Sequence, residues 1–443
     1  MRTPGVTALG LGAMIGAGIF VLTGMAAGKA GPALILAFAL NGAVALIVGA
    51  CYAELATMMP KAGGAYVWAK AGLGNCFGFF AGWMSAFAQL IACALYAAAF
   101  GSFTRHLLSA TIGIAPGDWL GPFATVSVLL VILVTNYRGA VETGRLGLVV
   151  TGLKVAILFV VVVFGLWAIF SRGDGLAAFT PFFPEGIGGL VSAMGITFVA
   201  FEGYEIIVQS GEEVKRPGAT IPRAIFLSIA IAVALYLLVA TVLLGAVTPP
   251  PGQALHAYLG ELKELGLMEA AGQFVPYGKL LLLIAGLAST ASALNATVYG
   301  SSRIVFAMGR AEDLPALLGR VHRVRQTPYL ALGATGTLMA VVAVFLPIED
   351  IAAGANIMFL LVFIMVCATV IRLRRLRPER TRPFVVPLSP WLPALGIITG
   401  LGLAFWLLKV SLIAWGVAAG WLLLGGGVFY YQQQANRPPD RDA

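Results

Sequence analysis

Stretches of about 20 mostly apolar residues recur along the chain, and their length constrains the fold more than any other feature of the sequence. A helix of that length spans the roughly 30 Å hydrocarbon core of a bilayer. The chain is 60% hydrophobic and 11% charged, whereas a soluble domain carries about 25% charged residues. Short segments of alternating hydrophobicity, which are typical of membrane barrels, are absent. The sequence therefore predicts an all-α integral membrane protein.

Twelve windows satisfy this length criterion, and we expect one transmembrane helix in each. Their limits are 5–28, 33–58, 74–104, 119–137, 146–170, 187–210, 221–246, 276–308, 328–346, 350–373, 388–409 and 411–431. The third and eighth windows are longer than a perpendicular span requires, so these helices are expected to tilt or to extend beyond the bilayer.

The distribution of basic residues predicts the orientation of the chain. With a cytoplasmic N-terminus, most of the 28 Lys and Arg residues fall in segments on the cytoplasmic side. The opposite side carries only Lys29, Arg105, Arg172, Lys263, Lys279 and Lys409. This asymmetry predicts that both termini are cytoplasmic and that the protein lies in the cell membrane. The net charge of +9 is thus explained by topology and anionic lipid, and no nucleic-acid partner is expected.

Two of the windows carry residues that interrupt a membrane helix. The first contains glycines at positions 10, 12, 16 and 18, and the sixth contains the stretch Phe201-Glu-Gly-Tyr-Glu205. A charge at bilayer depth costs at least about 2.5 kcal/mol, and glycine weakens a helix by about 1 kcal/mol relative to alanine. Paired interrupted segments of this kind indicate the binding site of a membrane transporter.

The interrupted windows are the first and the sixth, which is the placement that an inverted repeat of five plus five helices predicts. We therefore expect a first repeat at 1–170, a second repeat at 187–373, two further helices at 388–431 and a cytoplasmic tail at 432–443. The repeat is an inference from this placement, because the two halves share no visible sequence identity.

Four segments, in order along the chain, resemble the amino acid–polyamine–organocation (APC) superfamily. They are Gly12-Ala-Met-Ile-Gly-Ala-Gly-Ile-Phe20, Tyr52-Ala-Glu-Leu-Ala-Thr-Met-Met-Pro-Lys-Ala-Gly-Gly-Ala-Tyr-Val-Trp68, Gly211-Glu-Glu-Val-Lys-Arg-Pro217 with Ile221-Pro-Arg-Ala224, and Ser301-Ser-Arg-Ile-Val-Phe-Ala-Met-Gly-Arg310. The resemblance implies a LeuT-like fold and the transport of amino acids. Lys154 makes the chain most similar to the ApcT-like proton-coupled permeases.

The glycine-rich interruption of the first window is the candidate site for a substrate carboxylate. Unwound backbone beside the positive end of a half-helix leaves N–H groups that suit an anion, and glycine allows close approach. The resemblance assigns this role to Gly16, Ala17 and Gly18, with Met14 and Ile15 beside them. Many family members have serine where Ala17 stands, so a hydroxyl contact is missing. Close helix packing is the alternative explanation of these glycines.

The sixth window is the candidate site for the substrate ammonium. The resemblance implies that carbonyls of Val199, Ala200 and Glu202 accept it and that Phe201 closes the site from outside. Lining residues at Gly203 and Tyr204 complete this half. Three interpretations of Glu202 remain open: a neutral acid, a partner for Lys154, or a selector for a cationic side chain. Glu205 is either functional or a structural hydrogen-bond acceptor.

Lys154 lies about nine residues into the fifth window, roughly 13 Å deep. The resemblance places its ammonium where sodium-coupled members of the superfamily bind Na⁺, with Ser289 and Ser292 as neighbours on the eighth window. A lysine removed from water can release and rebind a proton, so Lys154 is the candidate for proton coupling. A permanently charged structural tether is the alternative.

These observations predict a secondary transporter that moves amino acids by alternating access, driven by protons and independent of sodium. The first alternative is an amino acid or amine exchanger without proton coupling. The second is a membrane sensor or an ion-conducting protein that does not accumulate amino acids. No zinc motif, nucleophile elbow or phosphate loop appears, and the 4 cysteines have no metal-ligand spacing, so we expect no enzyme, metal or cofactor.

Overall fold

The structure is a computed structural model and describes residues 1–60, 63–112, 117–139, 145–172 and 177–435. All regular elements of these residues are helical, which confirms the all-α prediction. The longer helices are α1 Thr3–Met14, α2 Thr23–Ala30, α3 Leu34–Met58, α4 Gly64–Leu73, α5 Asn75–Ile112, α6 Leu120–Tyr137, α7 Arg145–Arg172, α8 Gly186–Thr197, α9 Tyr204–Gln209, α10 Pro217–Ala246, α11 Leu255–Leu262, α12 Gly266–Phe274, α13 Gly278–Arg310, α14 Tyr329–Phe345, α15 Ile348–Leu376, α16 Trp391–Val410 and α17 Leu412–Ala435. Short turns of other helix types are η1 Gly18–Leu22, η2 Gly31–Ala33, η3 Ala177–Phe179, η4 Phe198–Phe201, η5 Gly211–Glu213, η6 Lys263–Leu265 and η7 Ala316–Gly319.

Each of the twelve predicted windows coincides with helical structure. Ten helical runs of the described residues are long and apolar enough to cross a membrane. The run Thr3–Met58 covers the first two windows, and Tyr329–Phe345 is a shorter apolar helix in the ninth window. The number twelve itself stays a prediction. The expected tail at 432–443 is described as far as residue 435, where α17 continues beyond the predicted limit at 431.

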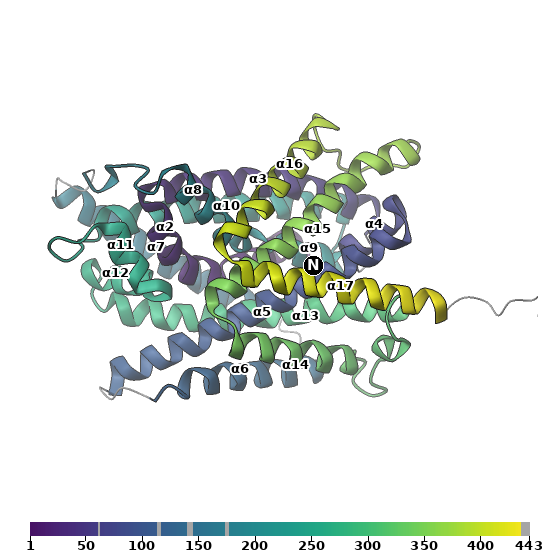
Figure 1. Cartoon of the computed structure of the whole chain (residues 1–443), viewed down its shortest axis with the longest axis horizontal. Helices are drawn as coiled ribbons and strands as arrows, with labels where there is room; N and C mark the ends of the chain where they lie inside the picture. Colours follow the sequence, from purple (N-terminus) through teal and green to yellow (C-terminus); the bar gives the residue numbers. More distant parts are fainter. Residues whose placement is uncertain (61–62, 113–116, 140–144, 173–176, 436–443) are drawn as a thin grey trace, which may run out of the picture.

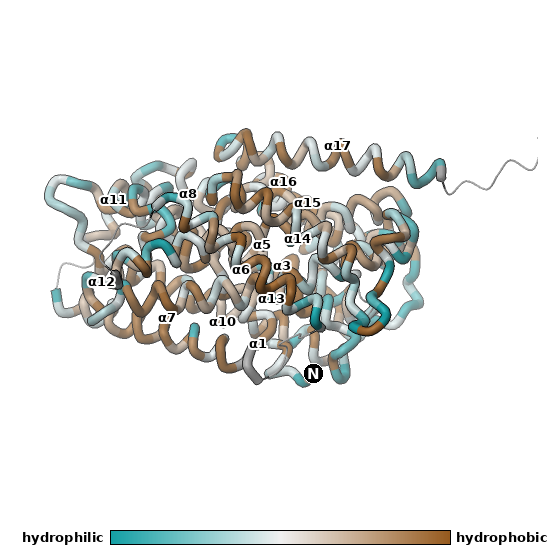
Figure 2. The backbone as a smooth tube through the Cα atoms, turned by 90° about the horizontal axis from the view of Figure 1, so that it is seen from below, coloured by the Kyte–Doolittle hydropathy of each residue, from teal (hydrophilic) through white to brown (hydrophobic). Residues whose placement is uncertain are grey.

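The long helices run roughly along one axis of the molecule. Helix α5, with 38 residues, packs along α13, with 33 residues. Helices α11 and α12 lie at one end of the long axis and α4 lies at the other (Figure 1). Figure 2 shows apolar backbone over the middle and hydrophilic segments gathered at the two ends. This banding is the pattern that a bilayer demands of a protein crossing it.

The outer helices present apolar side chains away from the protein. On α7, Leu153 is 54% exposed whereas its neighbour Lys154 is 1% exposed. One face of α7 is therefore turned outward, where lipid would cover it, and the other face is turned into the bundle. Lys154 lies on the inner face, so its charge is removed from both lipid and bulk water.

Short helices lie at the two ends of the molecule. At one end α11 packs on α2 and is followed by η6. A Cβ at Gly24 would lie 2.9 Å from the Cα of Gly266, so α12 also approaches α2 at backbone distance. Helix α4 lies at the other end (Figure 1).

Candidate functional site

The first predicted helix is broken at the expected glycines. Helix α1 ends at Met14, residues Ile15 and Gly16 leave the helical path, and the chain resumes in the single π-helical turn η1. No backbone acceptor among the described residues takes the N–H of Gly16. Gly16 is also packed closely, because a Cβ there would lie 2.9 Å from the Cβ of Ala293. The break thus combines a free backbone donor with tight surroundings.

The sixth predicted helix is broken as well. Helix α8 ends at Thr197, η4 follows, and α9 begins only at Tyr204. A broken helix leaves carbonyls without intrahelical partners. Two buried side-chain amides act as the missing donors. Asn41 donates to the Met194 carbonyl at 2.9 Å, and Asn356 donates to the Ile196 carbonyl at 3.0 Å. The end of α8 is therefore capped by neutral side chains from α3 and α15.

The two breaks lie against each other. A Cβ at Gly18 would lie 2.6 Å from the Cβ of Ala200, and a Cβ at Gly203 would lie 2.7 Å from the backbone nitrogen of Met14. Both distances are below any normal carbon contact, so only glycine fits at these positions. The structure brings the two predicted halves of the site into backbone contact.

Tyr236 of α10 joins the same two segments. Its hydroxyl is 2.7 Å from the Met14 carbonyl and 2.9 Å from the Ala200 carbonyl. Both partners are acceptors, so the single hydroxyl proton is shared between them. Tyr236 therefore links the end of α1 to η4 through one buried group.

Lys154 lies at the C-terminal end of α1. Its Nζ donates to the carbonyls of Gly12 and Ile15, each at 3.1 Å, and to the carbonyl of Ser289 at 3.4 Å. An ammonium has three protons, so these three acceptors use all of them. The C-terminal end of a helix also carries partial negative charge, which favours a cation there. The lysine thus connects α1, α7 and α13 without a carboxylate partner in the part of the chain that the structure describes.

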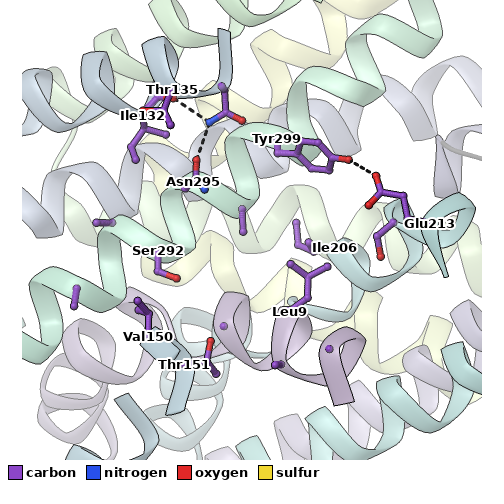
Figure 3. A pocket seen from close by; sticks show the side chains of 18 of the residues that line it. Leu9, Ile132, Thr135, Val150, Thr151, Ile206, Glu213, Ser292, Asn295 and Tyr299 are labelled. Carbon is purple, nitrogen blue, oxygen red and sulfur yellow. Dashed lines mark hydrogen bonds between the residues drawn. The ribbon is translucent and has the colours of Figure 1, made fainter. Parts of the chain in front are cut away.

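The two predicted serine neighbours occupy different positions. The hydroxyl of Ser289 donates to the Ile15 carbonyl, so this residue belongs to the same cluster as Lys154. Ser292 lies one turn further along α13 and lines a cavity of about 390 Å³. Thr151, one turn from Lys154 on α7, lines the same cavity (Figure 3). The cavity therefore approaches the lysine cluster from one side.

The cavity continues from this point towards the start of α1. Leu9 and Ile206 lie on its walls, and Glu213 and Tyr299 lie near one end of it (Figure 3). The Tyr299 hydroxyl donates to the Glu213 carboxylate at 2.9 Å, and Arg303 pairs with the same carboxylate at 3.2 Å. The amino group of Met1 donates to the Glu213 carbonyl. These contacts tie Met1, which precedes α1, to η5, and η5 to α13.

The two glutamates of the second break have different surroundings. Glu205 accepts from the Tyr52 hydroxyl at 2.5 Å and from the Gln89 amide at 3.0 Å. Glu202 is 6% exposed, and neither of its carboxylate oxygens has a hydrogen-bond partner among the described residues. Lys154 bonds only to carbonyls, so the predicted alternative of a Glu202–Lys154 pair does not occur in this structure.

The remaining predicted lining residues are buried and packed. The ring of Phe201 lies 5.1 Å from that of Tyr236 and 6.3 Å from that of Phe38. Tyr204 packs on Tyr52, with ring centroids 5.2 Å apart, and does not line the cavity of Figure 3. Phe201 and Tyr204 are therefore part of the packed interior and not of the cavity wall.

The carbonyls that were expected to receive an ammonium already have donors. The Ala200 carbonyl accepts from Tyr236, the Val199 carbonyl from the Glu202 N–H at 3.4 Å, and the Glu202 carbonyl from the Glu205 N–H at 3.1 Å. A carbonyl has two lone pairs, so each can accept one further donor.

Several contributors to the site were not predicted from the sequence. Tyr236, Asn41 and Asn356 each bond to a broken helix, and Gln89 bonds to Glu205. A signal was present, because each is a polar residue inside an otherwise apolar window and polar groups in a membrane need partners. The sequence does not show which carbonyl each of them would meet.

The comparisons with known proteins identify the family of this chain. A profile of the amino acid permease family matches residues 2–428. The chain belongs to this family. The APC resemblance is thereby confirmed, and the protein is a multi-pass membrane protein of a transporter family and not an enzyme.

Three curated relatives match almost the whole chain. The branched-chain amino acid permease BcaP of Bacillus subtilis (strain 168) is 30% identical, over 96% of this chain and 91% of the relative. BcaP of Lactococcus lactis subsp. cremoris (strain MG1363) is 30% identical, over 97% and 93%. The methylthioribose transporter of Bacillus subtilis (strain 168) is 29% identical, over 96% and 91%. The similar proteins are thus transporters whose named substrates differ.

Proposed function

We propose that this protein is a secondary active transporter that moves amino acids across the cell membrane by alternating access, coupled to protons and independent of sodium. The permease relatives support an amino acid substrate. The inverted repeats at 1–170 and 187–373 would provide the two halves that move against each other. Both termini would be cytoplasmic, as the basic residues predict.

The substrate would bind between the two breaks. Its carboxylate would meet the free N–H groups around Gly16, Ala17 and Gly18, and its ammonium the carbonyls of Val199 and Ala200. The contact between Gly18 and Ala200 supports this assignment, because it holds donors from one break beside acceptors from the other. In the compact arrangement described above, α1 or α9 would have to move to admit the substrate.

The observation that carries the coupling proposal is that one ammonium on α7 bonds to carbonyls of two other helices. Lys154 bonds to two carbonyls of α1 and one of α13. A proton leaving the lysine would remove the charge and one donor, so the carbonyls of Gly12, Ile15 and Ser289 would compete for the two that remain. The end of α1 would then be held less firmly against α7 and α13.

The cavity beside this cluster would supply the route for protons. It is lined by Gly12, Thr151 and Ser292, each from one of the three helices that the lysine joins. The side-chain amides of Asn136 and Asn295 add polar groups to the wall of the cavity. Water in such a cavity could carry a proton to within one helical turn of Lys154.

The test is uptake by purified protein in proteoliposomes under an imposed proton gradient. Wild-type protein should accumulate an amino acid without sodium, and Lys154→Ala should lose gradient-driven accumulation. Lys409→Ala is the matched control, because Lys409 contacts only the ring of Trp406 among the described residues. Gradient-driven uptake by Lys154→Ala at the wild-type level, without substrate-linked proton movement in wild type, would rule out the coupling.

An exchanger with Lys154 as a fixed charge is the second candidate. In the structure, the Lys154 ammonium donates all three of its protons to carbonyls. This arrangement favours the exchanger, because a fully hydrogen-bonded ammonium is suited to hold the helices together as a permanent charge. Lys154→Arg distinguishes the two, since arginine keeps its charge at every accessible pH. An exchanger should tolerate this change, whereas a proton-coupled transporter should lose accumulation.

A further inference from the structure

Glu202 is a buried acid that the interactions described above do not use. It lies between η4 and α9 at the second break, is 6% exposed, and has both carboxylate oxygens unpartnered among the described residues. An isolated carboxylate in a low-dielectric site is costly unless a proton or a cation neutralises it. The side chain therefore requires either a proton or a cation.

No described residue meets that requirement. Lys154 uses its three protons on carbonyls, and the other ion pairs of the described residues involve other carboxylates. The titratable groups close enough to interact with Glu202 electrostatically are Glu205, Tyr96 and Tyr204. The first is a second acid and the other two are phenols, so none of them supplies a positive charge.

The location of Glu202 connects it to the substrate site. Tyr96 of α5, which interacts with Glu202, also borders the first break, because a Cβ at Gly16 would lie 3.2 Å from the Tyr96 ring. Glu202 directly follows Phe201 and precedes Gly203, which touches α1. The unpartnered carboxylate thus belongs to a residue that lies where the two breaks and α5 meet.

We propose that Glu202 binds the positively charged end of the substrate side chain, so that the favoured substrates are amino acids with an amine or guanidinium side chain. This inference rests on the proposed function. The backbone at the two breaks would hold the α-carboxylate and α-ammonium, and Glu202 would hold the second cation. The positive charge of the substrate side chain would neutralise the Glu202 carboxylate.

The nearby glutamate provides a matched comparison. Glu205 is also buried at the second break, but Tyr52 and Gln89 already donate to it. Glu205→Gln should lower the unfolding temperature, because it disrupts a satisfied network. Glu202→Gln should leave that temperature unchanged or raise it, because it removes a buried unpaired acid.

The experiment measures ligand-induced thermal stabilisation and uptake with arginine, lysine, ornithine, leucine and valine in wild type and both variants. Wild type should be stabilised most by the cationic amino acids. Glu202→Gln should reduce the arginine-to-leucine affinity ratio about tenfold or more, since a hydrogen bond to a charged group is lost. Glu205→Gln should leave this ratio near the wild-type value.

Two results would overturn the inference, and they are distinguishable from failure of the proposed function. Transport of leucine or valine with no binding of cationic amino acids would refute the role of Glu202 while leaving amino acid transport intact. An unchanged ratio in a folded Glu202→Gln protein would do the same. Absence of uptake for every amino acid would refute the proposed function, and the inference with it.

Discussion

Gly18→Ala tests whether the two broken helices must touch. Gly18 opens η1, and its backbone does not adopt a left-handed conformation, so alanine is compatible with the local chain path. The added methyl carbon would lie 2.6 Å from the Cβ and 2.8 Å from the Cα of Ala200. The perturbation is therefore steric and acts at the contact between the two breaks.

The size of the effect follows from these distances. Non-bonded carbons pack at about 3.5–4.0 Å, so the new contact is too short by about 1 Å. No side-chain rotation can relieve it, because both carbons of Ala200 are fixed to the backbone. Overpacking of this kind costs about 1–3 kcal/mol. If the whole cost falls on the state in which the breaks touch, the population of that state falls about 5- to 150-fold.

The assay is initial-rate uptake in proteoliposomes together with thermal unfolding in detergent. Gly18→Ala should reduce the maximal rate in a protein that still unfolds cooperatively. Gly402→Ala is the control, because a Cβ at Gly402 on α16 meets nothing within 4 Å. It should transport normally and gain at most about 1 kcal/mol of helix stability. Wild-type kinetics in Gly18→Ala would refute the idea that transport needs close contact of the breaks.

Two further predictions concern single hydroxyl groups. Tyr236→Phe should destabilise the protein by about 1–3 kcal/mol and lower its rate of uptake, because two buried carbonyls lose their shared donor; an unchanged unfolding temperature would contradict this. Burial, followed by the hydrogen bond to Asp313 and its charge, raises the pKa of Tyr66 on α4. The folded protein therefore holds this proton more tightly than the unfolded chain, so stability should fall as pH rises above about 10. Tyr66→Phe should show a smaller alkaline loss in the unfolding temperature, and an identical pH profile would contradict the assignment.

The helices and the positions of both breaks could be predicted from the sequence. Apolar length locates a membrane helix because the bilayer imposes it, and the breaks coincide with glycines and with a charged stretch. Several helices begin and end within a few residues of the windows, as for α3 at 34–58 against 33–58 and α10 at 217–246 against 221–246, whereas α5 extends to residue 112 beyond its window limit at 104. These features depend on local composition alone.

The partners of the broken backbone could not be predicted. Asn41 meets a carbonyl 153 residues away, and Tyr236 meets one 222 residues away. Such pairings depend on how helices pack, and hydropathy carries no information about it. The same reason explains why the sequence left three interpretations of Glu202 open, of which the structure removes only the pair with Lys154. A Lys154 pair is absent, and both oxygens are unpartnered among the described residues.

The two breaks are capped by different chemistry, and the difference bears on where a proton can act. The carbonyls at the end of α8 are satisfied by Asn41 and Asn356, whose amides keep their donors at any physiological pH. The carbonyls at the end of α1 are satisfied by Lys154, whose number of donors changes when a proton leaves. If Lys154 releases a proton as proposed, a change in proton concentration would alter how α1 is held while α8 stays capped. At the second break, the Glu202 carboxylate has no partner among the described residues, and a substrate cation would pair with it. On this view the proton would act on the first break and the substrate cation on the second, and Tyr236, which bonds to both, would transmit a shift of one to the other.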